Sequence, residues 1–231
     1  MAALPPLHTY RYTLFFPERY IAQPYWTELL QLIDIQKQSG MNRARSEQKR
    51  TQALAEYLRR NGISEEAYQA LQEVAARPFY RQDSATWSGP IVIPSHQLYG
   101  CLIETADHLN RSQRPCDPDN LRHVLRLSDA VTTRQEADGI YTRPVMPKSG
   151  TGQPLSNQRS LRSDPYIENF SATGTVAFYA DTIHNADELQ DFFAYAGQRI
   201  GVGAARKMAC GRFLVIAWEA VPSSAAPPAP A

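Results

Sequence analysis

The residues with the clearest potential for chemistry lie in one glycine-rich, basic stretch, Ile200 to Val215. Its glycines and its basic pair are Gly201, Gly203, Gly211, Arg206 and Lys207. Glycines permit positive φ and let backbone amides approach a ligand closely. The two cations, with no acid between residues 199 and 213, add charge that suits a phosphate backbone. An ordinary helix-to-strand connection with a glycine cap is the alternative interpretation.

Two regular elements must position this stretch. Residues 185–200 predict a helix, because apolar side chains recur at helical spacing and Asn185 is a credible N-cap. Gly201 stands where such a helix would end in a left-handed turn. Arg212–Ile216 then predicts a strand. The stretch is not a Walker loop, since no Gly-Lys-Ser/Thr follows and a strand, rather than a helix, comes next.

A second stretch combines a strand, a turn and a helix entrance. Ile91–Ile93 predicts a short strand, and Ser95 caps a helix whose apolar stripe runs to residue 109. Gly100 inside that helix costs roughly 1 kcal/mol against alanine, which favours close approach of another backbone or a ligand. His96 lies at the entrance, where it either touches phosphate or is a surface histidine without a role.

The remaining sequence predicts two strands and two insertions. Thr9–Phe16 and Thr173–Thr182 are strands by their alternation. A block at about 25–80 predicts three helices and contains a run of basic residues. This basic run is either a solvated helical face or a second surface for an anionic partner. The polar region at about 111–169 follows the second stretch.

Within the polar region, residues 124–131 and 141–146 predict the two arms of an extended hairpin. Residues 148–163 have the composition of a mobile loop, and such long loops are often functional. The cations of this loop are Lys148, Arg159 and Arg162. Residues 223–231 are rich in Ser, Ala and Pro and predict disorder.

Composition excludes several classes of protein. The chain has 231 residues, a net charge of +1 and 43% hydrophobic residues, so binding of an anionic partner must depend on local clustering. Three widely spaced cysteines form no zinc or redox motif, which favours reduced thiols, a cytoplasmic location and no metal or other cofactor. No apolar run approaches the ~20 residues that span a bilayer, and no signal-peptide core is present.

Without its two insertions the chain orders as strand, strand, helix, strand, helix, strand. This order predicts an α+β fold with a ferredoxin-like (RRM-like) sheet over residues 1–222. Two motifs then resemble the RAMP superfamily, the RNA-binding proteins of CRISPR systems. Residues 201–211 are similar to its Gly-φ-Gly, five residues, Gly-φ-Gly loop, with Ala209 in place of one glycine. Residues 93–102 are similar to the Ile-Pro-x-Ser-x-Leu-Lys-Gly signature of the subunits that line crRNA, with Tyr99 replacing the basic residue and the serine displaced by one.

The resemblance implies a non-enzymatic subunit of an antiviral CRISPR effector ribonucleoprotein, without a membrane partner. Its implied partners are guide RNA (crRNA), a complementary target nucleic acid, other effector subunits and further copies of itself. The region at 111–169 would then be a thumb-like hairpin. The residues implied to contact RNA are Ser95, His96, Gln97, Tyr99, Gly100, Gly201, Gly203, Arg206, Lys207, Gly211, Arg212, Lys148, Arg159 and Arg162.

Two other functions stay open. The superfamily also contains endoribonucleases, which commonly use a histidine as general acid and base. Asp83 lies in the zone where some backbone subunits carry a target-cutting aspartate, although a loop or cap role is the alternative. No pair of suitable groups shares a motif here, so we expect no catalysis. A mobile-element protein that uses the fold as an interaction module is the third possibility.

Overall fold

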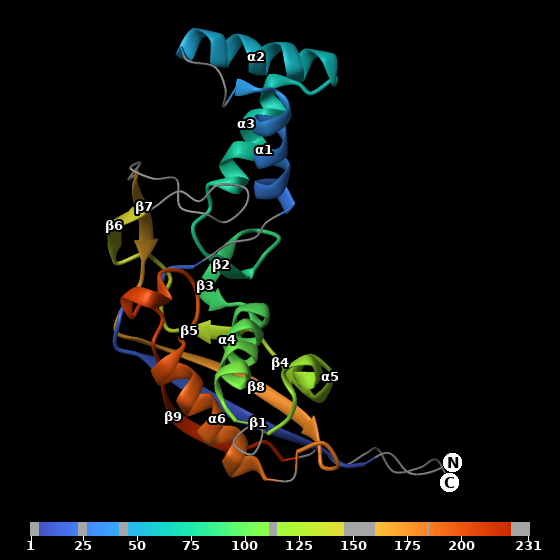
Figure 1. Cartoon of the computed structure of the whole chain (residues 1–231), viewed down its shortest axis with the longest axis vertical. Coiled ribbons are helices and arrows are strands. Elements are labelled where there is room, and N and C mark those ends of the chain that lie inside the picture. Colours follow the sequence, from blue (N-terminus) through green and yellow to red (C-terminus); the bar gives the residue numbers. More distant parts are fainter. Residues whose placement is uncertain are drawn as a thin grey trace, which may run out of the picture. The chain divides into compact units, whose positions relative to one another are not determined.

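The computed structural model describes residues 5–22, 27–41, 46–110, 115–145, 160–183 and 185–222. The chain divides into two compact units, which Figure 1 shows: Met1–Ala22 with Tyr80–Ala231, and Gln23–Phe79. Lys148 and Arg159, and the tail for which disorder is predicted, lie outside the described residues.

The larger unit is built on an antiparallel sheet. Its strands are β1 (Leu7–Phe16), β2 (Tyr80–Asp83), β3 (Ser88–Ile93), β4 (Leu125–Leu127), β5 (Ala130–Thr132), β8 (Phe170–Tyr179) and β9 (Leu214–Ala220). Its main helices are α4 (Ser95–His108) and α6 (Ala186–Arg199), with the short α5 (Leu121–Val124) after the 3-10 turn Pro118–Asn120. The strand order is β2-β3-β5-β8-β1-β9, and β4 also pairs with β8.

This topology confirms the predicted ferredoxin-like α+β fold. In chain order the repeat is β1, α4, β4 with β5, β8, α6, β9, which is a βαββαβ unit. In space β1 lies between β8 and β9, and all of these pairs are antiparallel. The β2–β3 hairpin extends the sheet beyond β5.

The alternation of β1 explains where the core lies. Tyr12, Leu14 and Phe16 are fully buried on one face of the strand. Phe16 stacks on Phe170 of β8 with 4.7 Å between ring centroids, and Tyr12 packs against Phe193 of α6 at 5.5 Å. The aromatic run therefore joins sheet to helix, because a strand with period 2 turns all these rings to the same side.

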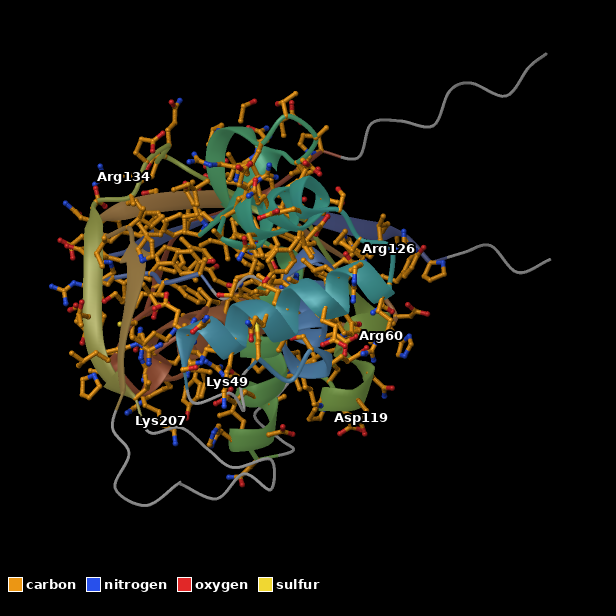
Figure 2. The ribbon with its side chains drawn as sticks, turned by 90° about the horizontal axis from the view of Figure 1, so that it is seen from above. Lys49, Arg60, Asp119, Arg126, Arg134 and Lys207 are labelled. Carbon is orange, nitrogen blue, oxygen red and sulfur yellow. The ribbon has the colours of Figure 1, made fainter. Side chains whose placement is uncertain are left out.

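In its described residues, the smaller unit contains the α-helices α1 (Thr27–Gln38), α2 (Glu47–Arg60) and α3 (Glu65–Ala75). The helix starts are set locally: the side chain of Ser46 accepts from the amide of Lys49 at 3.3 Å, and that of Ser64 accepts from Ala67 at 3.1 Å. Ile35, Leu58 and Tyr68 form a buried cluster in this unit. Lys49 and Arg60 lie toward opposite ends of α2 (Figure 2).

The predicted hairpin between 124–131 and 141–146 is wrong. Residues 125–132 belong to the main sheet as β4 and β5, where they pair with β8 and β3. The true hairpin joins β6 (Gly139–Val145) to β7 (Ser160–Tyr166) as a separate two-stranded sheet. The described hairpin strands therefore occupy only part of the region at 111–169. Strands of three residues are too short to show a period, so the sequence carried no signal for their partners.

The predicted loop at 148–163 is also wrong at its end, since residues 160–163 form the first half of β7. Arg162 and Arg143 lie opposite one another in the hairpin, and the carboxylate of Asp164 accepts from both, at 2.8 and 3.3 Å. One carboxylate between two cations holds this end of the hairpin. Arg162 is thus an ion-paired strand residue.

Candidate nucleic-acid interface

The glycine-rich loop runs from the end of α6 to the start of β9 and is closed by backbone hydrogen bonds. The amide of Val202 donates to the carbonyl of Gly211 at 2.9 Å, so the two ends of the loop meet. The segment after β1 runs beside it: Ala204 N donates to Ile21 O at 2.8 Å, and Gly211 N donates to Arg19 O at 2.6 Å. These bonds make the loop a rigid part of the larger unit.

The glycines are required by this close packing. Gly203 and Gly211 have φ of +78° and +74°, a region that L side chains rarely adopt. A Cβ on Gly203 would lie 2.3 Å from the carbonyl oxygen of Ile21, and one on Gly211 would lie 1.8 Å from that of Val202. The amides of Gly201 and Gly211 donate within the chain. The amides of Gly201 and Gly211 are thus occupied by the carbonyl oxygens of Ala196 and Arg19.

Two alanines adopt the left-handed conformation at the tip of the loop. Ala205 has φ of +58° and Ala209 has φ of +63°, on either side of a 3-10 turn, Arg206–Met208. Ala209 stands where the similar family motif has glycine. The chain keeps the glycine geometry there with an alanine, at a cost of roughly 1–2 kcal/mol.

The loop cations meet α6 and α4 in a hollow of about 330 Å³. We call it the basic hollow; its charged and aromatic lining consists of Glu104, His108, Tyr195, Arg199, Arg206, Lys207 and Arg212. Four arginine or lysine side chains thus meet one carboxylate. Arg206 Nη1 lies 2.5 Å from Glu104 Oε2 of α4, and Arg212 donates to the carbonyl of Gln198 at 2.7 Å. The arrangement can bind an anion.

The entrance of α4, where a phosphate was expected, is occupied by a carboxylate of the chain itself. Ser95 N donates to Asp129 Oδ1 at 2.7 Å. A helix N-terminus favours negative charge, and Asp129 supplies it. The amide of Ser95 is therefore bonded to this carboxylate. The turn between β4 and β5 carries this aspartate, 34 residues from Ser95.

Two further residues of the second motif serve the fold. The Tyr99 hydroxyl donates to the carbonyl of Leu125 at 2.6 Å and accepts from the amide of Leu127 at 3.1 Å, so it braces β4 against α4. Gln97 Oε1 accepts from the Tyr20 hydroxyl at 2.9 Å. The Tyr99 hydroxyl and the Gln97 carbonyl oxygen are therefore bonded within the chain.

His96 and Gly100 complete the motif and lie exposed. The ring of His96 meets Tyr80 edge-on, with 5.6 Å between centroids. Partial desolvation lowers the pKa of His96; nearby Arg122 adds to the decrease and Asp129 opposes it. A Cβ on Gly100 would have no described protein atom within 4 Å, so the predicted close approach of another part of the chain is wrong.

Asp83, the weak catalytic candidate, caps a turn. Its carboxylate accepts from the amides of Ala85 and Thr86 at 2.9 and 3.1 Å, and from the Thr86 hydroxyl at 2.5 Å. These hydrogen bonds lower its pKa, with the hydroxyl contributing most. A carboxylate whose charged form is so stabilised is a poor general base. Within the described ranges, no group of three or more His, Cys, Asp or Glu side chains could hold a metal ion.

Sequence reasoning missed several residues at the interface. Glu104, Tyr195 and Arg199 line the basic hollow but lie on helices outside both motifs. Arg19 also went unnoticed; its guanidinium lies between the rings of Tyr141 and Tyr166 of the β6–β7 hairpin, 4.8 and 5.0 Å from their centroids. The hairpin thereby packs beside the loop. The one available signal was helical spacing, since Tyr195 and Arg199 are four residues apart.

Fold and site together define an α+β protein of ferredoxin-like topology with a basic hollow beside a glycine-rich loop. The chain is similar to a chain of a solved structure described as "Cryo-EM structure of the Type III-B Cmr-beta bound to cognate target RNA", with 10% identity and a TM-score of 0.48. The similarity covers 93% of this chain and 61% of that one. No protein-family model and no curated protein matches. In the part of the chain that the structure describes, no helix is long and apolar enough to cross a membrane.

Proposed function

We propose that this chain binds the phosphates of single-stranded RNA at the basic hollow, as a non-enzymatic subunit of a CRISPR effector-type ribonucleoprotein. One observation carries the proposal. Four cationic side chains, from α6, from the glycine-rich loop and from the residue after that loop, line the same hollow as a single carboxylate. Two of those cations, Arg206 and Lys207, belong to the motif that resembles the RAMP loop, and Arg212 follows it directly. Guide RNA, a complementary target, other effector subunits and further copies of the chain are the partners that this resemblance adds.

Recognition through these side chains is independent of sequence. Arginine and lysine contacts to phosphate position a nucleic acid but do not read its bases. Each contact releases condensed counterions, so affinity falls as salt rises. A chain with a net charge of +1 can bind in this way because its cations are gathered at one place. The hollow therefore suits a partner whose sequence varies, as that of a guide RNA does.

The test replaces two cations of the hollow, the exposed Lys207 and the half-buried Arg212, as Lys207→Gln with Arg212→Gln. It measures binding of three single-stranded RNAs of different sequence at several salt concentrations. We expect a similar loss for every RNA, with the slope of log K against log salt falling by about 0.7 for each lost contact. Arg126→Gln is the control: Arg126 is exposed, belongs to the same unit, and lies well apart from Lys207 (Figure 2). Unchanged affinity of the double variant at all salt concentrations would contradict the proposal.

A further inference from the structure

The geometry points to a specific ligand for the basic hollow: a nucleotide with a terminal phosphate monoester, either free or at the end of an RNA. This inference rests on the proposed function, because it uses the same hollow, and it names the chemical group that the hollow selects. Size, charge and an unpartnered aromatic ring carry it.

Size limits the ligand to about one nucleotide. The hollow measures about 330 Å³, at the small end of the roughly 300–1,000 Å³ of small-molecule sites. Proteins that hold a run of nucleotides use a charged groove along the backbone, with successive stacking platforms. The lining of the basic hollow contains two rings, those of Tyr195 and His108, rather than a longer run of stacking platforms.

Charge favours a monoester over a diester. Glu104 offsets the charge of Arg206, at 2.5 Å. Among the described residues, Arg199, Lys207 and Arg212 have no carboxylate within ion-pair distance, so three positive charges remain. A phosphate monoester carries about −1.5 to −2 at pH 7, whereas an internal diester carries a single charge. The surplus of positive charge in the hollow therefore matches a phosphate monoester better than an internal diester.

Arg212 is prepared for such a group. One of its guanidinium nitrogens donates to the carbonyl of Gln198 at 2.7 Å, which fixes the fork and leaves its other donors for an anion. Arginine binds phosphate through two parallel N–H groups when its plane is held in place. The backbone near the end of α6 thus orients a side chain that lies two residues before β9.

Tyr195 supplies a surface for the base. Its side chain is 37% exposed on α6, and it has no hydrogen bond or ring contact with any described residue. Arg199 follows it by four residues, so the two side chains lie on the same face of the helix. A base stacked on Tyr195 places its own phosphate within reach of Arg199 and the loop cations. Stacking of this kind accepts any base.

The test uses one short single-stranded RNA in four forms: with a 5′-phosphate, with a 3′-phosphate, with hydroxyl groups at both ends, and circular. Binding is measured by calorimetry on the full chain, with AMP and UMP as free-nucleotide competitors. We expect one phosphate-ended form to bind about fivefold tighter than the hydroxyl-ended and circular forms, as one added charge-assisted contact would give. Competition by AMP or UMP alone, without an end effect, would assign the hollow to free nucleotides.

Variants link the effect to the hollow. Arg199→Gln with Arg212→Gln should remove the advantage of the phosphate end, and Tyr195→Leu should reduce it, whereas Arg126→Gln should retain it. Equal binding of all four forms, with no competition by nucleotides, overturns the inference and leaves the proposed function standing. Nucleotide binding without RNA binding supports the inference and overturns the proposed function. Binding of neither contradicts both.

Discussion

Removal of one carboxylate should make this protein a tighter RNA binder. Glu104 holds Arg206 at 2.5 Å, with the two side chains 42% and 37% exposed. RNA must compete with this carboxylate for the guanidinium. Partly exposed ion pairs contribute about 0.2–1 kcal/mol, which corresponds to a factor of about 1.4–5 in an equilibrium constant. Glu104→Gln should therefore raise the affinity for single-stranded RNA by that factor, because glutamine keeps the shape of glutamate and removes its charge.

The salt dependence gives a second and independent measure. If Arg206 becomes a further phosphate contact, the slope of log K against log salt should steepen by about 0.7. The assay is a titration of one RNA at four salt concentrations, with wild type, Glu104→Gln and a matched control. That control is Glu168→Gln, because Glu168 pairs with Arg19 at 3.4 Å, at 43% and 42% exposure, and does not line the hollow. Equal or weaker binding by Glu104→Gln, with the control unchanged, would refute the reasoning.

The glycine-rich loop and the Asp83 turn supply the remaining predictions. Ala209→Gly should raise the free energy of unfolding by about 1 kcal/mol, since alanine is strained at φ of +63°. Thermal unfolding should then show an increase in Tm of about 2–4 °C. An unchanged Tm would mean that the strain is absent. Gly211→Ala should lower the Tm strongly, because its Cβ would lie 1.8 Å from the carbonyl of Val202; a wild-type Tm would show that the loop relaxes. Hydrogen bonds lower the pKa of Asp83 in the folded state. The charged carboxylate therefore stabilises the fold at pH values above the pKa that Asp83 has in the unfolded chain. This stabilisation is lost as the pH falls through the lower pKa of the folded state. Asp83→Asn should accordingly be less stable than wild type at pH 7, with the difference disappearing in acid, and a difference that does not depend on pH would contradict this. With guide RNA, complementary RNA and magnesium we expect no cleavage; regular cuts that vanish in Asp83→Ala would overturn the non-enzymatic assignment.

The sequence by itself determined the elements whose stability is local. The apolar spacing of residues 185–200 predicted α6 (Ala186–Arg199) within one residue at each end. The alternation of Tyr12, Leu14 and Phe16 gave β1 its buried face, because that pattern depends only on the two-residue period of a strand. Ser46 and Ser64 marked helix starts through hydrogen bonds that span three residues. The place of the glycine-rich loop followed from these elements.

Only the tertiary structure decided what each polar group faces. Asp129 fills the entrance of α4 from 34 residues away, and Glu104 pairs with Arg206 across 102 residues. No local pattern encodes such pairs, because each depends on how strands and helices pack. The same holds for the glycines. Gly203 and Gly211 have the spacing of a ligand-binding loop, yet a Cβ on either would clash with a carbonyl oxygen of the chain, that of Ile21 or of Val202. Spacing locates a loop along the chain, whereas the packing around it determines which groups remain for a ligand.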